Sequence, residues 1–179
     1  MIYLELDPQG RARVWLQALP DYSFFPAEVM ERKVSATTTV RAAARRAAIE
    51  AFVHKGGYCP CGLLGAEFVP DLSGMLTVQV MAASADLELL PHMLPGFTDQ
   101  VRRGLPREYA DSVMEGAIYT NSISPLGSGV LQFNCAAHGE VGSSPNAFRQ
   151  LGEMVTRLLQ MDPSSVTVEQ LLDLIQHKL

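Results

Sequence analysis

Alternating hydrophobic and polar residues predict strands in three parts of the chain. Residues 1–19 alternate on both sides of the turn-forming sequence DPQGR, a pattern typical of a β-hairpin. In residues 75–81 and 130–135, every second residue is apolar and lies on one face of the chain, with polar residues between them. These segments are expected to be strands of a sheet that is buried on one side.

Three other segments have apolar residues at spacings of three and four, which indicates amphipathic helices. The first begins at Pro106, the second begins after the N-cap candidate Ser144, and the third begins with Thr167 and Gln170 at capping-box spacing. Gly116 lies inside the first helix, where a glycine costs about 1 kcal/mol relative to alanine. We therefore expect another backbone to approach closely at Gly116.

The segment from Thr39 to Lys55 is predicted to be a further helix. A stripe of small and apolar residues precedes two glycines that act as a stop signal. On this helix Arg41, Arg45 and Arg46 share the polar face. That face is either an ordinary solvated surface or a local patch that contacts the phosphates of RNA.

Composition limits the classes of protein that the chain can belong to. The 179 residues, 47% of them hydrophobic, suit one α+β domain over residues 1–162, followed by an amphipathic terminal helix over residues 163–179. A net charge of −5 gives no overall attraction to nucleic acid or to anionic membranes. The odd number of cysteines, three, and the absence of a secretory leader pattern or a long apolar run predict a cytoplasmic protein with reduced thiols and no membrane partner.

The cysteines also raise the question of a metal site. Cys59, Cys61, Cys135 and His138 are groups that zinc accepts as ligands. However, the alternation places Cys135 on the apolar face of its strand, where a buried free thiol is the ordinary outcome. We therefore expect no metal and no cofactor.

Catalytic motifs are not evident in the sequence. There are no paired carboxylates, no triad order and no glycine-rich nucleotide loop. Ser143 and Ser144 are explained as residues that cap the following helix. The sequence favours a protein that is not an enzyme.

Two motifs between residues 104 and 159 resemble the fourth domain of elongation factor G. The first is a Gly-apolar-Pro-x-Glu-Tyr helix opening with a later glycine, and the second is a Ser-Ser-x-x-Ala-Phe helix opening after a strand and a turn. The matching residues are Gly104, Leu105, Pro106, Glu108, Tyr109, Gly116, Ser143, Ser144, Ala147 and Phe148.

The resemblance implies a two-layer α+β sandwich, with a mostly antiparallel sheet, helices on one face and a left-handed β-α-β crossover. It also implies a functional tip loop at His138, Gly139, Glu140 and Gly142. In the family this turn carries an exposed His and an Asp, whereas here Gly139 and Gly142 occupy those positions. The GTPase phosphate loop of the whole factor has no counterpart in this chain.

Two functions remain open from the sequence. One is a non-enzymatic module that contacts RNA or the ribosome, as the resemblance and the basic segment suggest. The other is a stand-alone interaction or structural domain, for example a homodimer, that kept the fold and lost RNA contact.

Overall fold

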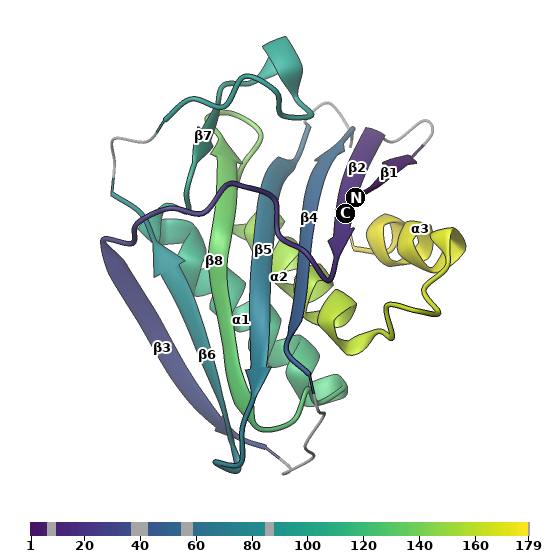
Figure 1. Ribbon diagram of the computed structural model, residues 1–179. Helices are drawn as coiled ribbons and strands as arrows, with labels where there is room; N and C mark the ends of the chain where they lie inside the picture. The colour runs from purple at the N-terminus through teal and green to yellow at the C-terminus, as the bar shows by residue number, and fades with distance from the viewer. Residues whose placement is uncertain (7–9, 37–42, 55–58, 85–87, 179) are drawn as a thin grey trace.

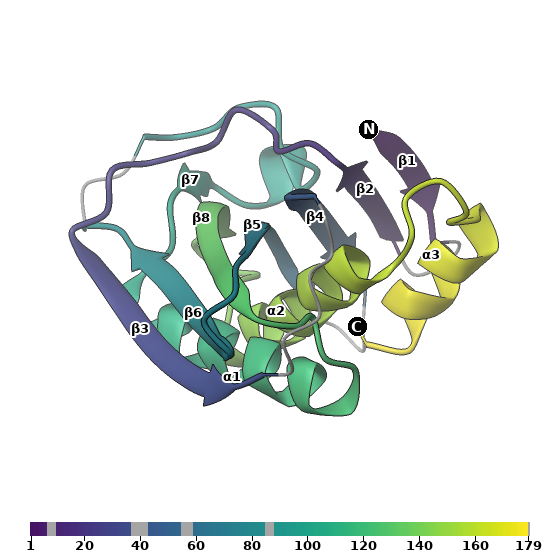
Figure 2. The ribbon, with the colours of Figure 1, turned by 60° about the horizontal axis from the view of Figure 1, so that its bottom comes forward.

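The computed structural model describes residues 1–6, 10–36, 43–54, 59–84 and 88–178 (Figure 1). Its elements form two layers: a mostly antiparallel sheet of eight strands, and helices that cover one face of that sheet (Figure 2). The expected α+β sandwich is thus confirmed. No helix in the described ranges is both long enough and apolar enough to cross a membrane.

The strands of the sheet follow the order β1-β2-β4-β5-β8-β6-β3, and β7 pairs with the far end of β8. The strands are β1 (Ile2–Glu5), β2 (Gly10–Leu16), β3 (Glu28–Ser35), β4 (Arg45–Val53), β5 (Cys61–Pro70), β6 (Met75–Ala82), β7 (Val101–Arg103) and β8 (Gly129–Gly139). The helices are a 3-10 turn η1 (Gly96–Thr98), α1 (Arg107–Ile123), α2 (Pro145–Gln160) and α3 (Val168–Gln176).

The central strand β8 is parallel to β6 and antiparallel to β5. In Figure 1 β6 and β8 both run upward, β8 lies to the right of β6, and the connection passes through β7 and then through α1 behind the sheet. This geometry is a left-handed β-α-β crossover, which is rare because strand twist favours right-handed connections.

The main core lies between the sheet and the helix pair α1 and α2. These two helices approach closely at Gly116, where an added Cβ would collide with the backbone carbonyl of Arg149. The close approach predicted at Gly116 is therefore confirmed. On the opposite face of the sheet a smaller cluster includes Leu63, Leu90 and Cys135, and Trp15 packs against it.

The predicted helix caps are present. The Ser144 side chain accepts a hydrogen bond from the backbone N–H of Ala147, and Thr167 forms a reciprocal capping box with Gln170. Helix α3 buries Leu171 and Ile175 in the same cluster as the main core. Its apolar stripe is therefore used for packing within the chain.

The helix predicted over residues 39–55 is wrong. Residues 45–53 form β4, which is antiparallel to β2 on one side and to β5 on the other, and residues 37–42 and 55–58 lie outside the described residues. Two of the alanines that suggested a helix, Ala47 and Ala51, belong to the core between the sheet and helices α1 and α2. Small side chains suit this position because α2 packs directly on β4 and β5.

Candidate functional site

The turn at residues 139–144, between β8 and α2, is hydrogen-bonded to the segment at residues 95–100. We call these two segments together the tip. The tip lies at the end of the sheet where β8 ends and β5 begins (Figure 1). It contains three of the four residues expected in the tip loop, Gly139, Glu140 and Gly142.

The carboxylate of Asp99 holds the turn in place. Asp99 Oδ1 accepts a hydrogen bond from the backbone N–H of Val141 at 3.1 Å, and Oδ2 accepts one from the N–H of Gly142 at 2.7 Å. The Cys61 thiol donates to the same Oδ2 at 3.3 Å. Two successive backbone donors therefore converge on one side chain that comes from a distant part of the chain.

The packing around Asp99 explains the two glycines of the turn. A Cβ at Gly139 would lie 2.7 Å from Cys61 Sγ and would collide with the Asp99 carboxylate, and a Cβ at Gly142 would lie 2.8 Å from the same sulfur. Contacts this short do not occur between a real Cβ and a packed neighbour. The turn has no room for side chains at these positions because Asp99, Cys61 and, at Gly142, the backbone carbonyl of Cys59 occupy the space.

Further hydrogen bonds join the turn to its neighbours. Ser143 Oγ donates to the carbonyl of Cys61 at 2.7 Å and accepts from the N–H of Gly139 at 2.8 Å. The N–H of Glu140 donates to the carbonyl of Gln100 at 3.0 Å, and the Glu140 carboxylate pairs with Arg102 at 2.6 Å. The turn is therefore pre-organised by contacts to two other segments.

Two apolar side chains of the tip are exposed to solvent. Phe97 is fully exposed and Val141 is 84% exposed. The sequence gives no signal for either, because exposure depends on how residues 95–100 fold over the turn. Both side chains lie at the tip, where Asp99 holds the turn in place.

His138, the fourth expected tip residue, is not displayed at the tip. Its Nδ1 lies 3.0 Å from the carbonyl oxygen of Gly104, and its ring packs edge-on against Tyr109. Burial lowers the pKa of His138 by more than the hydrogen bond to Gly104 raises it. The imidazole is therefore held neutral, with Nδ1–H donating to the carbonyl.

The four residues considered as zinc ligands lie in different surroundings. Cys59 Sγ is 3.1 Å from His54 Nδ1, and the Cys61 thiol is hydrogen-bonded to Asp99. Cys135 is buried in the smaller cluster, on the face of the sheet opposite α1 and α2. Among the described residues, no three His, Cys, Asp or Glu side chains are arranged to hold a metal ion.

Of the basic face expected at Arg41, Arg45 and Arg46, the two described arginines, Arg45 and Arg46, do not share a face. Consecutive residues of a strand point to opposite faces, so Arg45 and Arg46 diverge, and Arg41 lies outside the described residues. Arg46 pairs with Glu67 at 2.8 Å. Arg45 donates to the carbonyls of Leu159 and Met161, both at 2.9 Å.

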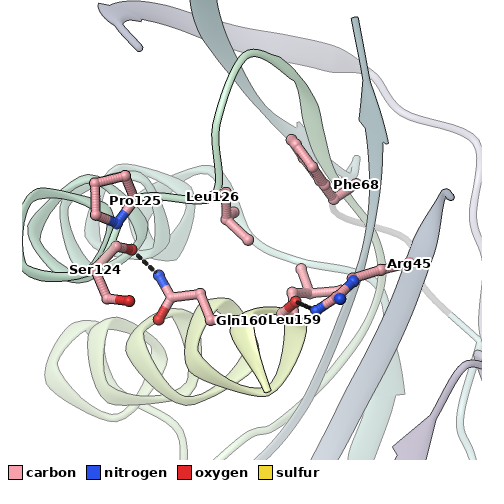
Figure 3. Close-up of a pocket in the computed structure, with 7 residues that line it drawn as sticks. All are labelled: Arg45, Phe68, Ser124, Pro125, Leu126, Leu159 and Gln160. Carbon is pink, nitrogen blue, oxygen red and sulfur yellow. Dashed lines mark hydrogen bonds between the residues drawn. The ribbon is translucent and has the colours of Figure 1, made fainter. Parts of the chain in front are cut away.

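The surroundings of Arg45 are shown in Figure 3. Its guanidinium caps the C-terminal carbonyls of α2, while the Gln160 amide binds the carbonyl of Ser124. The hollow between these groups is only about 40 Å³, whereas small-molecule pockets are typically about 300 Å³ or more. Arg45 is therefore a structural cap on α2.

We expect Asp99→Ala to loosen the turn and to lower the free energy of unfolding by about 1–2 kcal/mol, because two backbone donors lose their acceptor. Hydrogen exchange should show faster exchange of the Val141 and Gly142 amides, measured beside a denaturation curve. Asp99→Asn keeps the Oδ1 acceptor and should give an intermediate effect. Unchanged protection of both amides in Asp99→Ala would show that the carboxylate does not hold the turn.

Sequence reasoning missed Asp99, Phe97 and the role of Cys61 at the tip. The residues that surround the turn come from β5, from residues 95–100 and from β8, so no local motif contains them. No known protein family model matches the chain, and a search of curated proteins finds no match.

Proposed function

We propose that this protein is a binding module without catalytic activity and that it recognises the surface of another protein through its tip. The observation that carries this proposal is the exposure of Phe97 and Val141 at the tip, whose turn is held by Asp99. A pre-organised turn loses little conformational entropy on binding. Aromatic side chains, phenylalanine included, are also enriched in protein–protein interfaces.

The charges of the described residues support a protein partner over RNA. Arg32 is the one described arginine or lysine whose side chain has no bonded or ring partner. Binding to RNA depends on cations that are available to neutralise phosphates. Next to the tip, Arg102 of β7 is already paired with Glu140.

Contact with the ribosome is the second candidate. It is supported by the two motifs that resemble elongation factor G and by the left-handed crossover that this resemblance implies. The tip would then be the contacting end, as it is in that family. The net charge of −5 and the engaged arginines make this the weaker candidate.

The chemistry of the tip supports a role without catalysis. Burial raises the pKa of the Cys61 thiol to about 12, and the neighbouring Asp99 carboxylate acts in the same direction. A thiol of that pKa is protonated at neutral pH and is a poor nucleophile. A cytoplasmic location belongs to the same proposal, since Cys59, Cys61 and Cys135 are all free thiols.

The proposal is tested by placing a photoreactive amino acid at Val141 in cells that naturally express the protein. Leu72, which is 73% exposed in the turn after β5, is the matched control because it lies at the other end of that strand. We expect position 141 to form a covalent adduct that protease digests, and Phe97→Ser to reduce the amount of this adduct. Position 72 should form none.

An adduct at position 141 that nuclease removes, together with salt-sensitive sedimentation with ribosomes, would instead support the ribosome candidate. Equal adducts at positions 141 and 72 would contradict a binding role for the tip.

A further inference from the structure

The strand β3 forms one outer edge of the sheet and pairs with β6 only, among the described strands (Figure 1). No described segment covers its outer side in either ribbon view (Figure 2). An open strand edge carries unpaired backbone donors and acceptors, which another strand can use. The segment reads EVMERKVS, and its three central residues, Glu31, Arg32 and Lys33, are exposed.

The pairing with β6 determines which backbone groups are free. The N–H of Ala36 donates to the carbonyl of Gly74, in register with the β3 and β6 ladder. In an antiparallel ladder every second residue points both backbone groups at the same neighbour. The even-numbered residues of β3 therefore bond to β6, and Val29, Glu31, Lys33 and Ser35 point their N–H and C=O groups outward.

These free groups restrict how β3 can pair with a second copy of itself. Two outward-pointing residues must face each other, so the twofold axis must pass through a residue position. An axis at Glu31 would place two Glu31 carboxylates opposite each other, and an axis at Lys33 would place two ammonium groups together. An axis at Arg32 instead places Glu31 of each copy opposite Lys33 of the other.

We propose that two copies of this chain associate through antiparallel pairing of their β3 strands, with the twofold axis at Arg32. Four facing pairs of outward-pointing residues would each form two hydrogen bonds, or about eight backbone bonds between the copies. The two sheets would become one continuous sheet. This surface is separate from the tip, so the inference does not depend on the proposed function.

The side chains on the face of the sheet opposite α1 and α2 favour this register. The Gln132 amide donates to Gln79 Oε1 at 2.9 Å, and the Gln79 amide donates to Glu31 Oε2 at 2.9 Å. This row of polar groups ends at the Glu31 carboxylate, which also lies 3.3 Å from Lys33 of its own strand. Lys33 of the second copy would extend the row across the interface, twice by symmetry.

The other face of the strand is compatible with the same pairing. Met30 and Val34 are half-buried against the main core, and this register places Met30 of one copy opposite Val34 of the other. The unfavourable feature is Arg32, which faces its own copy at the axis. Like charges directly opposite each other are destabilising, so the dimer should be reversible and Arg32→Ser should tighten it.

The experiment is sedimentation equilibrium of the purified chain over a wide concentration range. We expect a monomer–dimer equilibrium that Lys33→Glu weakens by roughly 10-fold or more, because each Glu31 then faces a second carboxylate. The charge-swapped double variant Glu31→Lys with Lys33→Glu should restore dimerisation. Arg157→Glu makes the same change in net charge on α2, away from β3, and should have no effect.

A backbone variant tests strand pairing separately from charge. Ser35→Pro removes an N–H that points outward and not toward β6, so we expect it to weaken the dimer while circular dichroism and thermal unfolding of the monomer stay unchanged. A chain that stays monomeric at all concentrations would overturn the proposal. A dimer that Lys33→Glu does not weaken, or that the double variant does not restore, would overturn it equally. Phe97→Ser and Val141→Ser should leave the dimer intact, which separates this result from the test of the tip.

Discussion

Gly116→Ala is expected to lower the free energy of unfolding by about 3 kcal/mol, although alanine is intrinsically the better helix residue by about 1 kcal/mol. The added Cβ would collide with the carbonyl of Arg149 and lie 3.2 Å from the N–H of Glu153, both on α2. Backbone atoms inside a helix cannot move aside singly, so α1 and α2 would have to separate. Urea denaturation monitored by circular dichroism measures the loss.

Two variants on the same helix pair serve as comparisons for Gly116→Ala. Glu115→Ala changes an exposed neighbour on α1 and should alter stability by less than about 0.5 kcal/mol. Gly152→Ala places a Cβ 2.8 Å from the carbonyl of Val113 and should destabilise through the same contact from the other side. A neutral or stabilising Gly116→Ala would mean that the helices are not in backbone contact.

Arg13→Ala is expected to destabilise the protein by about 2–3 kcal/mol at neutral pH, because it leaves a buried carboxylate without its cation. Glu50 is only 1% exposed, and its side chain pairs with Arg13 at 3.1 Å and accepts from the N–H of Leu94 at 2.5 Å. Burial raises the pKa of Glu50, while the bonds to Leu94 and Arg13 lower it. Removal of Arg13 therefore raises this pKa further.

The pH dependence of that loss follows from linkage. When the pKa of a carboxyl is higher in the folded state, the folded state binds more protons, and stability falls as pH rises from the unfolded value near 4.5 through the folded value. The cost of Arg13→Ala should thus be small near pH 4.5 and largest above the folded pKa. Denaturation curves at several pH values measure this.

The double variant Arg13→Ala with Glu50→Gln is the control for the charge. Glutamine keeps an oxygen that accepts from Leu94 but carries no charge to compensate. In the Glu50→Gln background, Arg13→Ala should cost less than about 1 kcal/mol. An equal cost in both backgrounds would assign the effect to lost packing of the Arg13 side chain.

Elements with a long, regular period were predictable from the sequence. Helix α2 begins after Ser144 and ends at Gln160, as its apolar spacing and the Asp162-Pro163 sequence predict. The glycine in α1 also carried real information, because a costly residue inside a helix indicated a close neighbour. In both cases local physics and the fold require the same structure.

The remaining features depend on contacts that the local sequence does not contain. β4 has the composition of a helix, yet two neighbouring strands determine its conformation, since tertiary pairing outweighs propensities of a few tenths of a kcal/mol per residue. The tip is similar: Gly139 and Gly142 looked like lost function in the sequence. Their role became visible only with Asp99 beside them.

The position of β8 bears on how the chain acquires its structure during synthesis. β8 lies between β5 and β6 in the sheet. It begins at Gly129, 47 residues after β6 ends at Ala82. A nascent chain that has emerged only to Ala82 contains β5 and β6 with the edges that will face β8 still open. Such edges and their apolar side chains are prone to aggregation, so the ribosome-bound chain is expected to need protection until β8 has emerged.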